Sequence, residues 1–229
     1  MAVAIVTGGS GALGQAITLR LLADGASVSV PYVVPDERDR LMARVSAADR
    51  DRLLVAECDV TAPSAMTDHV RTVAKRFGEL NVLVTAVGGF AGGGLMETDL
   101  DTWNRMLALN LTSAFVAARA AVPAMRSARY GRIVMVASRA VVPPVAGIVA
   151  YTVSKAGVIT LAQALAAELK PNGITVNAVL PSTMDTPGNR AAMPDVDPKT
   201  WVPVEEVADA IAMLARQESG HITGTLLAI

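Results

Sequence analysis

Sulfur and imidazole ligands are scarce in this chain of 229 residues, which has one cysteine, Cys58, and two histidines, His69 and His221. A single cysteine excludes an internal disulfide, and the lack of a Cys/His cluster argues against a zinc site, so we expect no bound metal. A catalytic triad based on histidine would have to use one of the two imidazoles. The net charge of −1 offers no basic surface for nucleic acid or an anionic membrane, and we expect neither as a partner.

Segments that export a protein or anchor it in a membrane are also lacking. The first residues, MAVAIVTGG, have no basic region and no cleavage site, so they are not typical of a signal peptide. The uncharged stretch from Leu80 to Met96 is interrupted by glycines and does not predict a membrane span. Hydrophobic residues make up 52% of the chain and charged residues 18%, which is ample material for a folded core. We expect a soluble cytoplasmic protein.

Short apolar runs alternate with longer stretches that have a helical pattern. The runs begin at residues 2, 27, 53, 81, 132, 174 and 225, and the helical stretches begin near residues 11, 36, 64, 100, 150 and 204. Apolar strands joined by helices predict a parallel sheet covered on both faces, and right-handed crossovers make it a doubly wound α/β fold. No linker or repeat divides the chain, so we predict one domain over residues 1–229. Its least regular part, residues 181–203, is expected to be a loop that covers the substrate.

A glycine-rich turn, TGGSGALG, follows the first apolar run and opens the first helical stretch. Three glycines fit the spacing G-x-G-x-x-G, in which glycine permits a tight turn and lets the backbone approach a pyrophosphate. The N-terminus of the following helix offers free N–H groups and a partial positive charge to the phosphates. The alternative is a tight β–α turn without a ligand. The residues predicted to bind a dinucleotide here are Gly8, Gly9, Ser10, Gly11, Ala12, Leu13 and Gly14.

The ends of the second and third strands bear on which dinucleotide binds. An acidic residue at the end of the second strand favours NAD and a nearby arginine favours NADP. The likely positions are occupied by Tyr32, which we predict to contact the cofactor, and by Val33, and neither residue is diagnostic. Asp36 and Arg38 follow, and we expect them to be solvated charges at a helix start, so the prediction remains NAD or NADP. After the third strand, Asp59 and Val60 are expected to flank the adenine. The alternative is that Asp59 caps a helix.

Five short motifs occur in an order that is found in one large enzyme family. They are TGGSGALG, CDV from Cys58, LALNLTS from Leu107, VMVAS ending at Ser138 and YTVSK from Tyr151. Together they resemble the short-chain dehydrogenase/reductase superfamily over essentially the whole chain. The resemblance implies a Rossmann fold with a seven-stranded parallel sheet, bound NAD or NADP, and a catalytic tetrad of Asn110, Ser138, Tyr151 and Lys155. The cofactor contacts that it adds are Ala86, Val87, Gly88, Pro181, Thr183 and Thr186.

The chain departs from the family pattern at three places. Ala12 stands where the glycine turn of the family has its middle glycine, TAVG from Thr85 replaces a motif with two asparagines, and Ser182 replaces a glycine. We expect the geometry around the cofactor to differ slightly for this reason. Two further segments, VGGFAGGG from Val87 and VLPSTMDTPGNRAAMPDVDPKTW from Val179, resemble dihydropteridine reductases, a branch of the same superfamily.

Tyr151 and Lys155 lie four residues apart and share one face of a helix. An adjacent ammonium favours the phenolate and is expected to lower the tyrosine pKa by roughly 1–3 units from about 10. The phenol then serves as general acid in reduction and as general base in oxidation. The resemblance implies that Ser138 holds the substrate oxygen, Lys155 binds the nicotinamide ribose and Asn110 holds a water that relays protons. Taken singly, each residue also has an ordinary explanation as a capping, solvated or packing side chain.

We therefore predict an NAD(P)(H)-dependent oxidoreductase that moves hydride between nicotinamide and a carbonyl/alcohol pair of ketone or 3-oxoacyl type. One alternative is an enzyme like quinonoid dihydropteridine reductase, and another is a regulator that senses the dinucleotide without turnover. The helices over residues 100–127 and 150–170 are apolar around much of their circumference. They predict a homodimer or homotetramer formed through these helices, with a monomer as the alternative.

Overall fold

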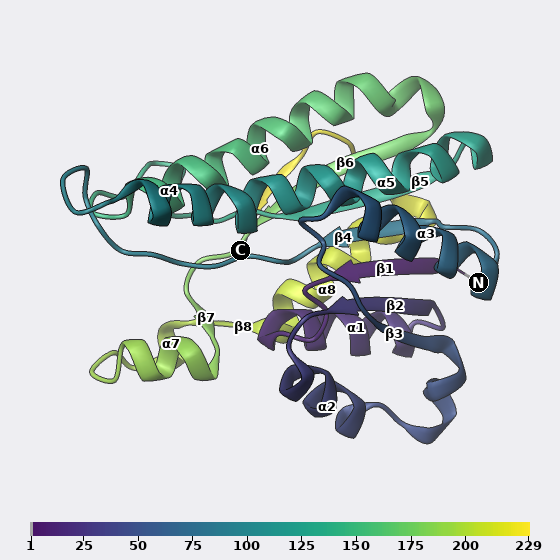
Figure 1. Ribbon diagram of the computed structural model, residues 1–229, viewed down its shortest axis with the longest axis horizontal. Coiled ribbons are helices and arrows are strands. Elements are labelled where there is room, and N and C mark those ends of the chain that lie inside the picture. The colour runs from purple at the N-terminus through teal and green to yellow at the C-terminus, as the bar shows by residue number, and fades with distance from the viewer. Residues whose placement is uncertain (1) are drawn as a thin grey trace.

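A computed structural model describes residues 2–229, in which a central sheet lies between two layers of helices (Figure 1). Within these residues the main sheet has seven strands in the order β3-β2-β1-β4-β5-β6-β9, and every neighbouring pair is parallel. The predicted doubly wound, seven-stranded α/β fold is therefore confirmed. The strands are β1 (Val3–Thr7), β2 (Ser27–Tyr32), β3 (Leu53–Glu57), β4 (Val82–Thr85), β5 (Gly131–Val136), β6 (Ile174–Leu180) and β9 (Leu226–Ala228).

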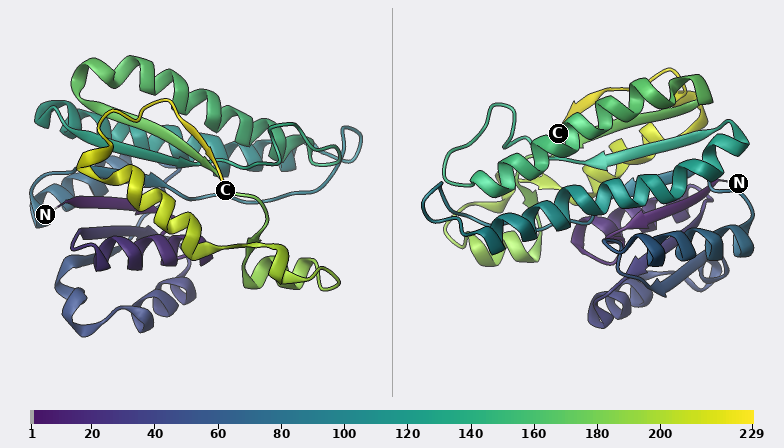
Figure 2. Two further views of the ribbon diagram at one scale, coloured as in Figure 1. Left: turned by 180° about the vertical axis from the view of Figure 1, so that it is seen from behind. Right: turned by 45° about the horizontal axis from the view of Figure 1, so that its top comes forward.

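Three helices cover each face of the sheet, as Figure 2 shows from two further directions. One face carries α1 (Ala12–Ala23), α2 (Pro35–Arg44) and α8 (Val204–Ala215), and the other carries α3 (Pro63–Phe77), α5 (Ser113–Ala128) and α6 (Val149–Leu169). Helix α4 (Leu100–Met106) continues through a π-helical turn, η2 (Leu107–Thr112), directly into α5. Short 3-10 turns complete the chain at Ala47–Arg52, Lys170–Asn172, Pro198–Thr200 and Gln217–Ser219.

Successive residues of the central strands pack into opposite cores. Val3 and Ile5 of β1 join the core beneath α3, α5 and α6, whereas Ala4 and Val6 join the core beneath α1 and α8. Strands β5 and β6 divide their residues in the same way. Each fully buried valine or isoleucine side chain contributes about 1.5–3 kcal/mol to folding. This two-sided burial explains why the strands read in the sequence as unbroken apolar runs.

The two long helical stretches use their apolar residues against the sheet. By length and composition alone, Leu100–Ala128 and Val149–Asn172 are apolar enough to cross a membrane. Ala117 of α5 and Val158 of α6 lie in the core of the sheet, which accounts for much of this apolar character. Their outer faces still expose Phe115 and Val153. An apolar surface is therefore left on this side of the molecule.

The carboxyl ends of four strands are in register at one edge of the sheet. Thr7 of β1 pairs with Thr85 of β4, and Val136 of β5 pairs with Val179 of β6. Strands β2 and β3 extend the sheet on one side of β1, and β4 begins the other side. The strand order thus reverses between β1 and β4, and open α/β sheets bind ligands in the crevice outside such a point.

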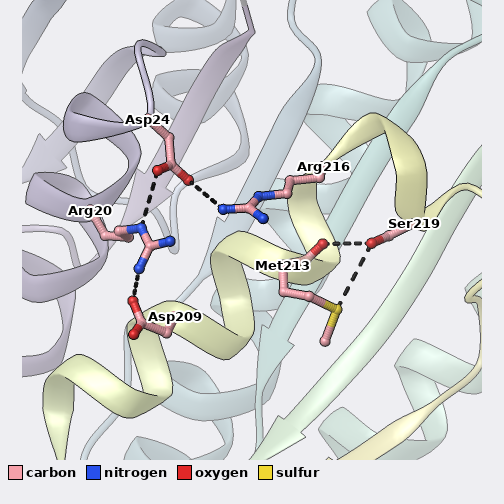
Figure 3. Close-up of polar contacts among 6 residues, drawn as sticks. All are labelled: Arg20, Asp24, Asp209, Met213, Arg216 and Ser219. Atoms are coloured by element: carbon pink, nitrogen blue, oxygen red, sulfur yellow. Dashed lines mark hydrogen bonds and ion pairs between the residues drawn. The ribbon is translucent and has the colours of Figure 1, made fainter.

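The opposite edge holds a larger hollow of about 880 Å³, lined by the segments before or at the starts of β1, β2, β4 and β5, by the ends of α1 and α8 and by the residues that follow these two helices. Beside it, Asp24 accepts hydrogen bonds from Arg20 at 3.2 Å and from Arg216 at 3.5 Å, and Arg20 also pairs with Asp209 (Figure 3). Partly exposed pairs of this kind contribute little to stability. We interpret them as a link between α1 and α8.

The segment after β6 is more regular than the predicted loop. Met184–Asp185 (β7) and Val202–Pro203 (β8) form a small parallel sheet, and α7 (Pro187–Ala192) lies between them. The guanidinium of Arg190 donates two hydrogen bonds to the carboxylate of Asp185, at 2.6 and 2.7 Å. In Figures 1 and 2, α7 stands apart from the main layers, beyond the carboxyl edge of the sheet.

A buried histidine makes stability depend on pH. The imidazole of His69 on α3 hydrogen-bonds the hydroxyl of Ser29 on β2 at 2.9 Å, and burial lowers the pKa of His69 from 6.5 to about 4. Between these values the unfolded chain binds a proton that the folded chain does not, so stability falls as the pH falls. From pH 7.5 to pH 5 this group should cost about 2 kcal/mol of unfolding free energy.

Urea unfolding at the two pH values checks this expectation. The pH-dependent loss of stability should shrink by about 2 kcal/mol in His69→Gln and should be unchanged in the control His221→Gln. Equal losses in both variants would show that His69 is not the titrating group.

Candidate active site

The four candidate tetrad residues come from three elements that meet at the carboxyl edge. Ser138 follows β5, Tyr151 and Lys155 lie near the start of α6, and Asn110 lies in the π-helical turn. Asn110, Ser138 and Lys155 are buried, and Tyr151 is partly exposed. A π turn inside an α-helix often accompanies a functional site. Four residues that are far apart in the sequence are thus gathered beside the crevice.

The phenol of Tyr151 lies between Phe90 and Ser138. The rings of Phe90 and Tyr151 meet edge to face with their centroids 5.0 Å apart, although Phe90 itself is 65% exposed. Burial raises the pKa of Tyr151 above 10, and the nearby Ser138 side chain opposes this shift without cancelling it. The expectation that Lys155 lowers this pKa is therefore wrong for this structure, because desolvation outweighs the other influences. The phenol is protonated at neutral pH.

The amine of Lys155 is held at the end of β5. Its Nζ donates a hydrogen bond to the carbonyl oxygen of Val136 at 2.8 Å. Burial lowers the pKa of Lys155 from 10.5 to about 8. The amine remains mostly charged at neutral pH, and one of its N–H groups is bonded to the carbonyl of Val136.

The amide of Asn110 joins the segment after β4 to α6. Its Oδ1 accepts a hydrogen bond from the N–H of Gly89 at 2.9 Å, and its Nδ2 donates to the carbonyl of Gly89 at 3.1 Å and to the hydroxyl of Ser154 at 2.9 Å. A Cβ on Gly88 would lie 2.6 Å from Asn110 Oδ1 and 3.2 Å from Lys155 Nζ. The ordinary explanation of Asn110, that it satisfies buried backbone groups, therefore applies here. Its predicted water relay remains a prediction.

Two loops beside the tetrad are joined by a backbone contact that the sequence did not predict. The N–H of Gly93 donates to the carbonyl of Gly147 at 2.8 Å, and the N–H of Val149 donates to the carbonyl of Gly93 at 3.0 Å. Gly93 and Gly147 both have positive φ, at 129° and 79°, which favours glycine at these positions. The two loops expose large apolar side chains, which are Phe90, Leu95 and Met96 in one and Val142 and Val145 in the other.

A cavity of about 260 Å³ lies at the carboxyl ends of β1 to β4. Nine predicted cofactor residues line it: Gly8, Ser10, Gly11, Tyr32, Asp59, Val60, Ala86, Val87 and Gly88. Val33, the other residue at the likely position beside Tyr32, also lines it, and the sequence reasoning missed five others: Pro31, Glu37, Cys58, Thr61 and Leu109. The predicted residues outside this lining are Gly9, Ala12, Leu13 and Gly14 in the turn and first helix, Tyr151 and Lys155 on α6, and Pro181, Thr183 and Thr186 after β6.

The glycine turn has the shape that a dinucleotide requires. A Cβ on Gly14 would lie 1.9 Å from the carbonyl oxygen of Gly8, so helix and turn are in backbone contact. A Cβ on Gly11 would meet only that same oxygen, at 3.5 Å, which leaves space beside the turn. Within the described chain, no side chain caps α1 and no acidic residue lies in its first turn. Its N–H groups and partial positive charge are therefore available to a pyrophosphate, and the residues present fit a dinucleotide.

Two predicted cofactor residues also make the local contacts of their alternative explanations. Oδ1 of Asp59 accepts hydrogen bonds from the N–H of Thr61 at 2.9 Å and from its hydroxyl at 2.7 Å, just before α3. The hydroxyl of Thr186 accepts from the N–H of Asn189 at 3.1 Å and so caps α7. Asp59 nevertheless lines the cavity. Contact of either residue with a cofactor remains a prediction.

Comparison with known proteins gives the family. The model of the family described as short chain dehydrogenase matches residues 2–197. Trans-4-hydroxycyclohexanecarboxylate dehydrogenase of Sinomonas cyclohexanicum is 33% identical, with 99% of this chain and 90% of that protein covered. 3-Oxoacyl-[acyl-carrier-protein] reductase of Escherichia coli is 31% identical, with 98% and 94% covered. The solved structure of levodione reductase, 24% identical, has the same fold, with a TM-score of 0.92 over 100% of this chain and 95% of that chain.

The chain therefore belongs to the short-chain dehydrogenase family. It is an NAD(P)-dependent oxidoreductase, and its substrate is a small molecule with a ketone or alcohol group. The sequence-based predictions of family, fold and reaction class are confirmed at this level.

The backbone contact at Gly14 predicts a large effect of one added methyl group. Gly14→Ala should lower the unfolding free energy by about 3 kcal/mol, or the melting temperature by about 6–12 °C, because the turn must move. The control Gly11→Ala, which adds the same methyl where space is open, should change the melting temperature by less than about 3 °C. Calorimetry of the three proteins without nucleotide measures this, and equal melting temperatures would contradict the role of Gly14.

Proposed function

We propose that this enzyme reduces a carbonyl group to an alcohol at neutral pH, with Tyr151 as the proton donor. The observation that carries this proposal is the partly buried phenol of Tyr151, which lies near the Ser138 side chain and has a pKa that desolvation raises. A phenol that is protonated at pH 7 is suited to donate a proton. Oxidation of an alcohol needs the phenolate and is expected to become favourable only at alkaline pH.

A bound nicotinamide nucleotide supplies the hydride. Tyr151 transfers its proton to the carbonyl oxygen as that oxygen gains negative charge. The hydroxyl of Ser138 donates a hydrogen bond to the same oxygen and stabilises the developing charge. The N–H of Ala140 donates to Ser138 Oγ at 3.2 Å, which holds this oxygen in place and leaves its own proton for the substrate.

Lys155 and Asn110 act on the position of the other groups. Lys155 is proposed to bind the nicotinamide ribose, which is supported by its location beside Gly88, a residue that lines the nucleotide cavity. Asn110 is proposed to be a positioning residue, because its amide links Gly89 to Ser154 on the catalytic helix. A water held near Asn110 would return a proton to the site after each turnover.

The substrate is proposed to be an apolar ketone, cyclic or of 3-oxoacyl type. The exposed apolar side chains of the loops after β4 and β5, of which Phe90 contacts Tyr151, support an apolar substrate. The names of the two relatives, which specify a hydroxycyclohexanecarboxylate and a 3-oxoacyl group on acyl-carrier protein, support a cyclic and a 3-oxoacyl substrate respectively. Residues 181–203, with α7 beyond the carboxyl edge, are proposed to cover the substrate. The enzyme is also proposed to be cytoplasmic, which cell fractionation would test.

Turnover measurements test the proposed reaction. NADH and NADPH should each be offered with cyclic ketones, 3-oxoacyl thioesters and quinonoid pterin. Tyr151→Phe should lower kcat for ketones by at least about 10²-fold, since it removes the proton donor, while the nucleotide Kd should change by less than about threefold. Full ketone activity in Tyr151→Phe would exclude the phenol as the acid. Pterin turnover that survives the substitution would favour the pterin reductase alternative.

The enzyme is further proposed to be a homodimer or homotetramer formed through residues 100–127 and 150–170. Phe115 on α5 is 46% exposed and Val153 on α6 is 42% exposed, on the face that the sheet does not cover. Light scattering should give the mass of two or four chains, and Phe115→Glu should lower it. The control Val196→Glu, at a residue that is 43% exposed in the segment before β8, should leave the mass unchanged. The mass of one chain for the unaltered protein would contradict this proposal.

A further inference from the structure

The charged residues that line the nucleotide cavity are both acidic. They are Glu37 at the start of α2 and Asp59 after β3, and none of the lining residues in the described chain is basic. We infer that this enzyme selects NAD(H) over NADP(H), and that Glu37 is the residue that makes the selection. The inference rests on the proposed function, because it names the nucleotide of that same site.

Glu37 is held over the glycine turn by a contact that is remote in the sequence. Its Oε2 accepts a hydrogen bond from the hydroxyl of Ser10 at 3.2 Å. Ser10 lies inside the turn and is only 4% exposed, and its carbonyl accepts from the side chain of Gln15 at 2.8 Å. The other end of α2 is tied to the same place, since Arg44 donates to Gln15 at 3.0 Å. Two contacts therefore fix α2, and with it the carboxylate, at the mouth of the cavity.

The first arginine of α2, Arg38, is held by contacts with Tyr32 and Asp39. Arg38 donates to the hydroxyl of Tyr32 at 3.2 Å, forms an ion pair with Asp39 at 2.7 Å and lies over the ring of Tyr32. It is not among the residues that line the cavity. Of Glu37 and Arg38, only Glu37 lines the cavity that a 2′-phosphate would enter. Arg38 would have to leave both Tyr32 and Asp39 to provide a phosphate site.

NAD(H) and NADP(H) differ only in the group at the 2′ position of the adenosine ribose. NAD(H) presents a ribose 2′-hydroxyl, which can donate a hydrogen bond to a carboxylate. NADP(H) presents a phosphate dianion, which a carboxylate repels. The partial positive charge at the N-terminus of α2 would favour the phosphate, but Asp36 and Glu37 already occupy its first turn. The arrangement therefore favours the hydroxyl and discriminates against the phosphate by repulsion.

Binding measured without substrate tests this inference. Fluorescence titration should give a Kd for NADH at least about tenfold lower than that for NADPH, which corresponds to about 1.4 kcal/mol. Glu37→Gln should bring the two values within about threefold, mainly by tightening NADPH, because the repulsion is removed. Asp36→Asn is the matched control, since it removes the same charge from the same helical turn at an exposed side chain outside the lining. It should change the ratio by less than about twofold.

Three outcomes would overturn the inference. They are equal or tighter binding of NADPH by the unaltered enzyme, equal effects of Glu37→Gln and Asp36→Asn, and a selective loss of NADPH binding in Arg38→Ala. The last would mean that Arg38 leaves Tyr32 to bind the phosphate. Circular dichroism of each variant checks that a change in Kd does not reflect unfolding.

The same titrations separate this inference from the proposed function. Selective binding of NADH without turnover of any ketone would leave the selectivity intact and contradict the proposed reaction. Ketone turnover with NADPH preferred would do the reverse.

Discussion

Backbone contact between the first turn and the first helix is the constraint on which the rest of the site depends. Gly14 at the start of α1 touches the carbonyl of Gly8, and Gly8 in turn lies against Ala86 and Val87 after β4. The turn after β1, the start of α1 and the end of β4 therefore meet at the point where the strand order reverses. Larger side chains would force these segments apart, and the crevice between them would lose its shape.

Close packing of the same kind continues from the nucleotide cavity to the tetrad candidates. Gly88 follows directly and lies against both Asn110 and Lys155, and Asn110 then joins Gly89 to Ser154 on α6. The hydrogen bonds are buried or partly buried, so each unmade one would be costly. The cavity and the tetrad candidates are thus two ends of one packed structure. We infer that the position of the phenol is coupled to the position of the glycine turn.

The sequence predicted those features that depend on local pattern. The unbroken apolar runs predicted the seven strands. The spacing of the motifs predicted that the four tetrad candidates lie at one edge of the sheet. The features it missed depend on contacts between remote segments. Phe90 lies against Tyr151 through folding of the loop after β4, and Glu37 reaches Ser10 only because α2 packs over the turn. The direction of the Tyr151 pKa shift belongs with these features, because burial is a property of the folded chain and cannot be deduced from a four-residue spacing.

Charge is arranged along the crevice in an order that suits the parts of NAD(H). Carboxylates of Glu37 and Asp59 lie at one end, the positive N-terminus of α1 lies between, and the buried amine of Lys155 lies at the other end. In the proposed binding mode, acceptors for ribose hydroxyls would be followed by donors for the pyrophosphate and by a cation for the second ribose. A net charge of −1 predicts none of this. With so small an overall field, recognition must rest on local groups, and a single carboxylate at the adenosine end is then enough to decide between two otherwise identical ligands.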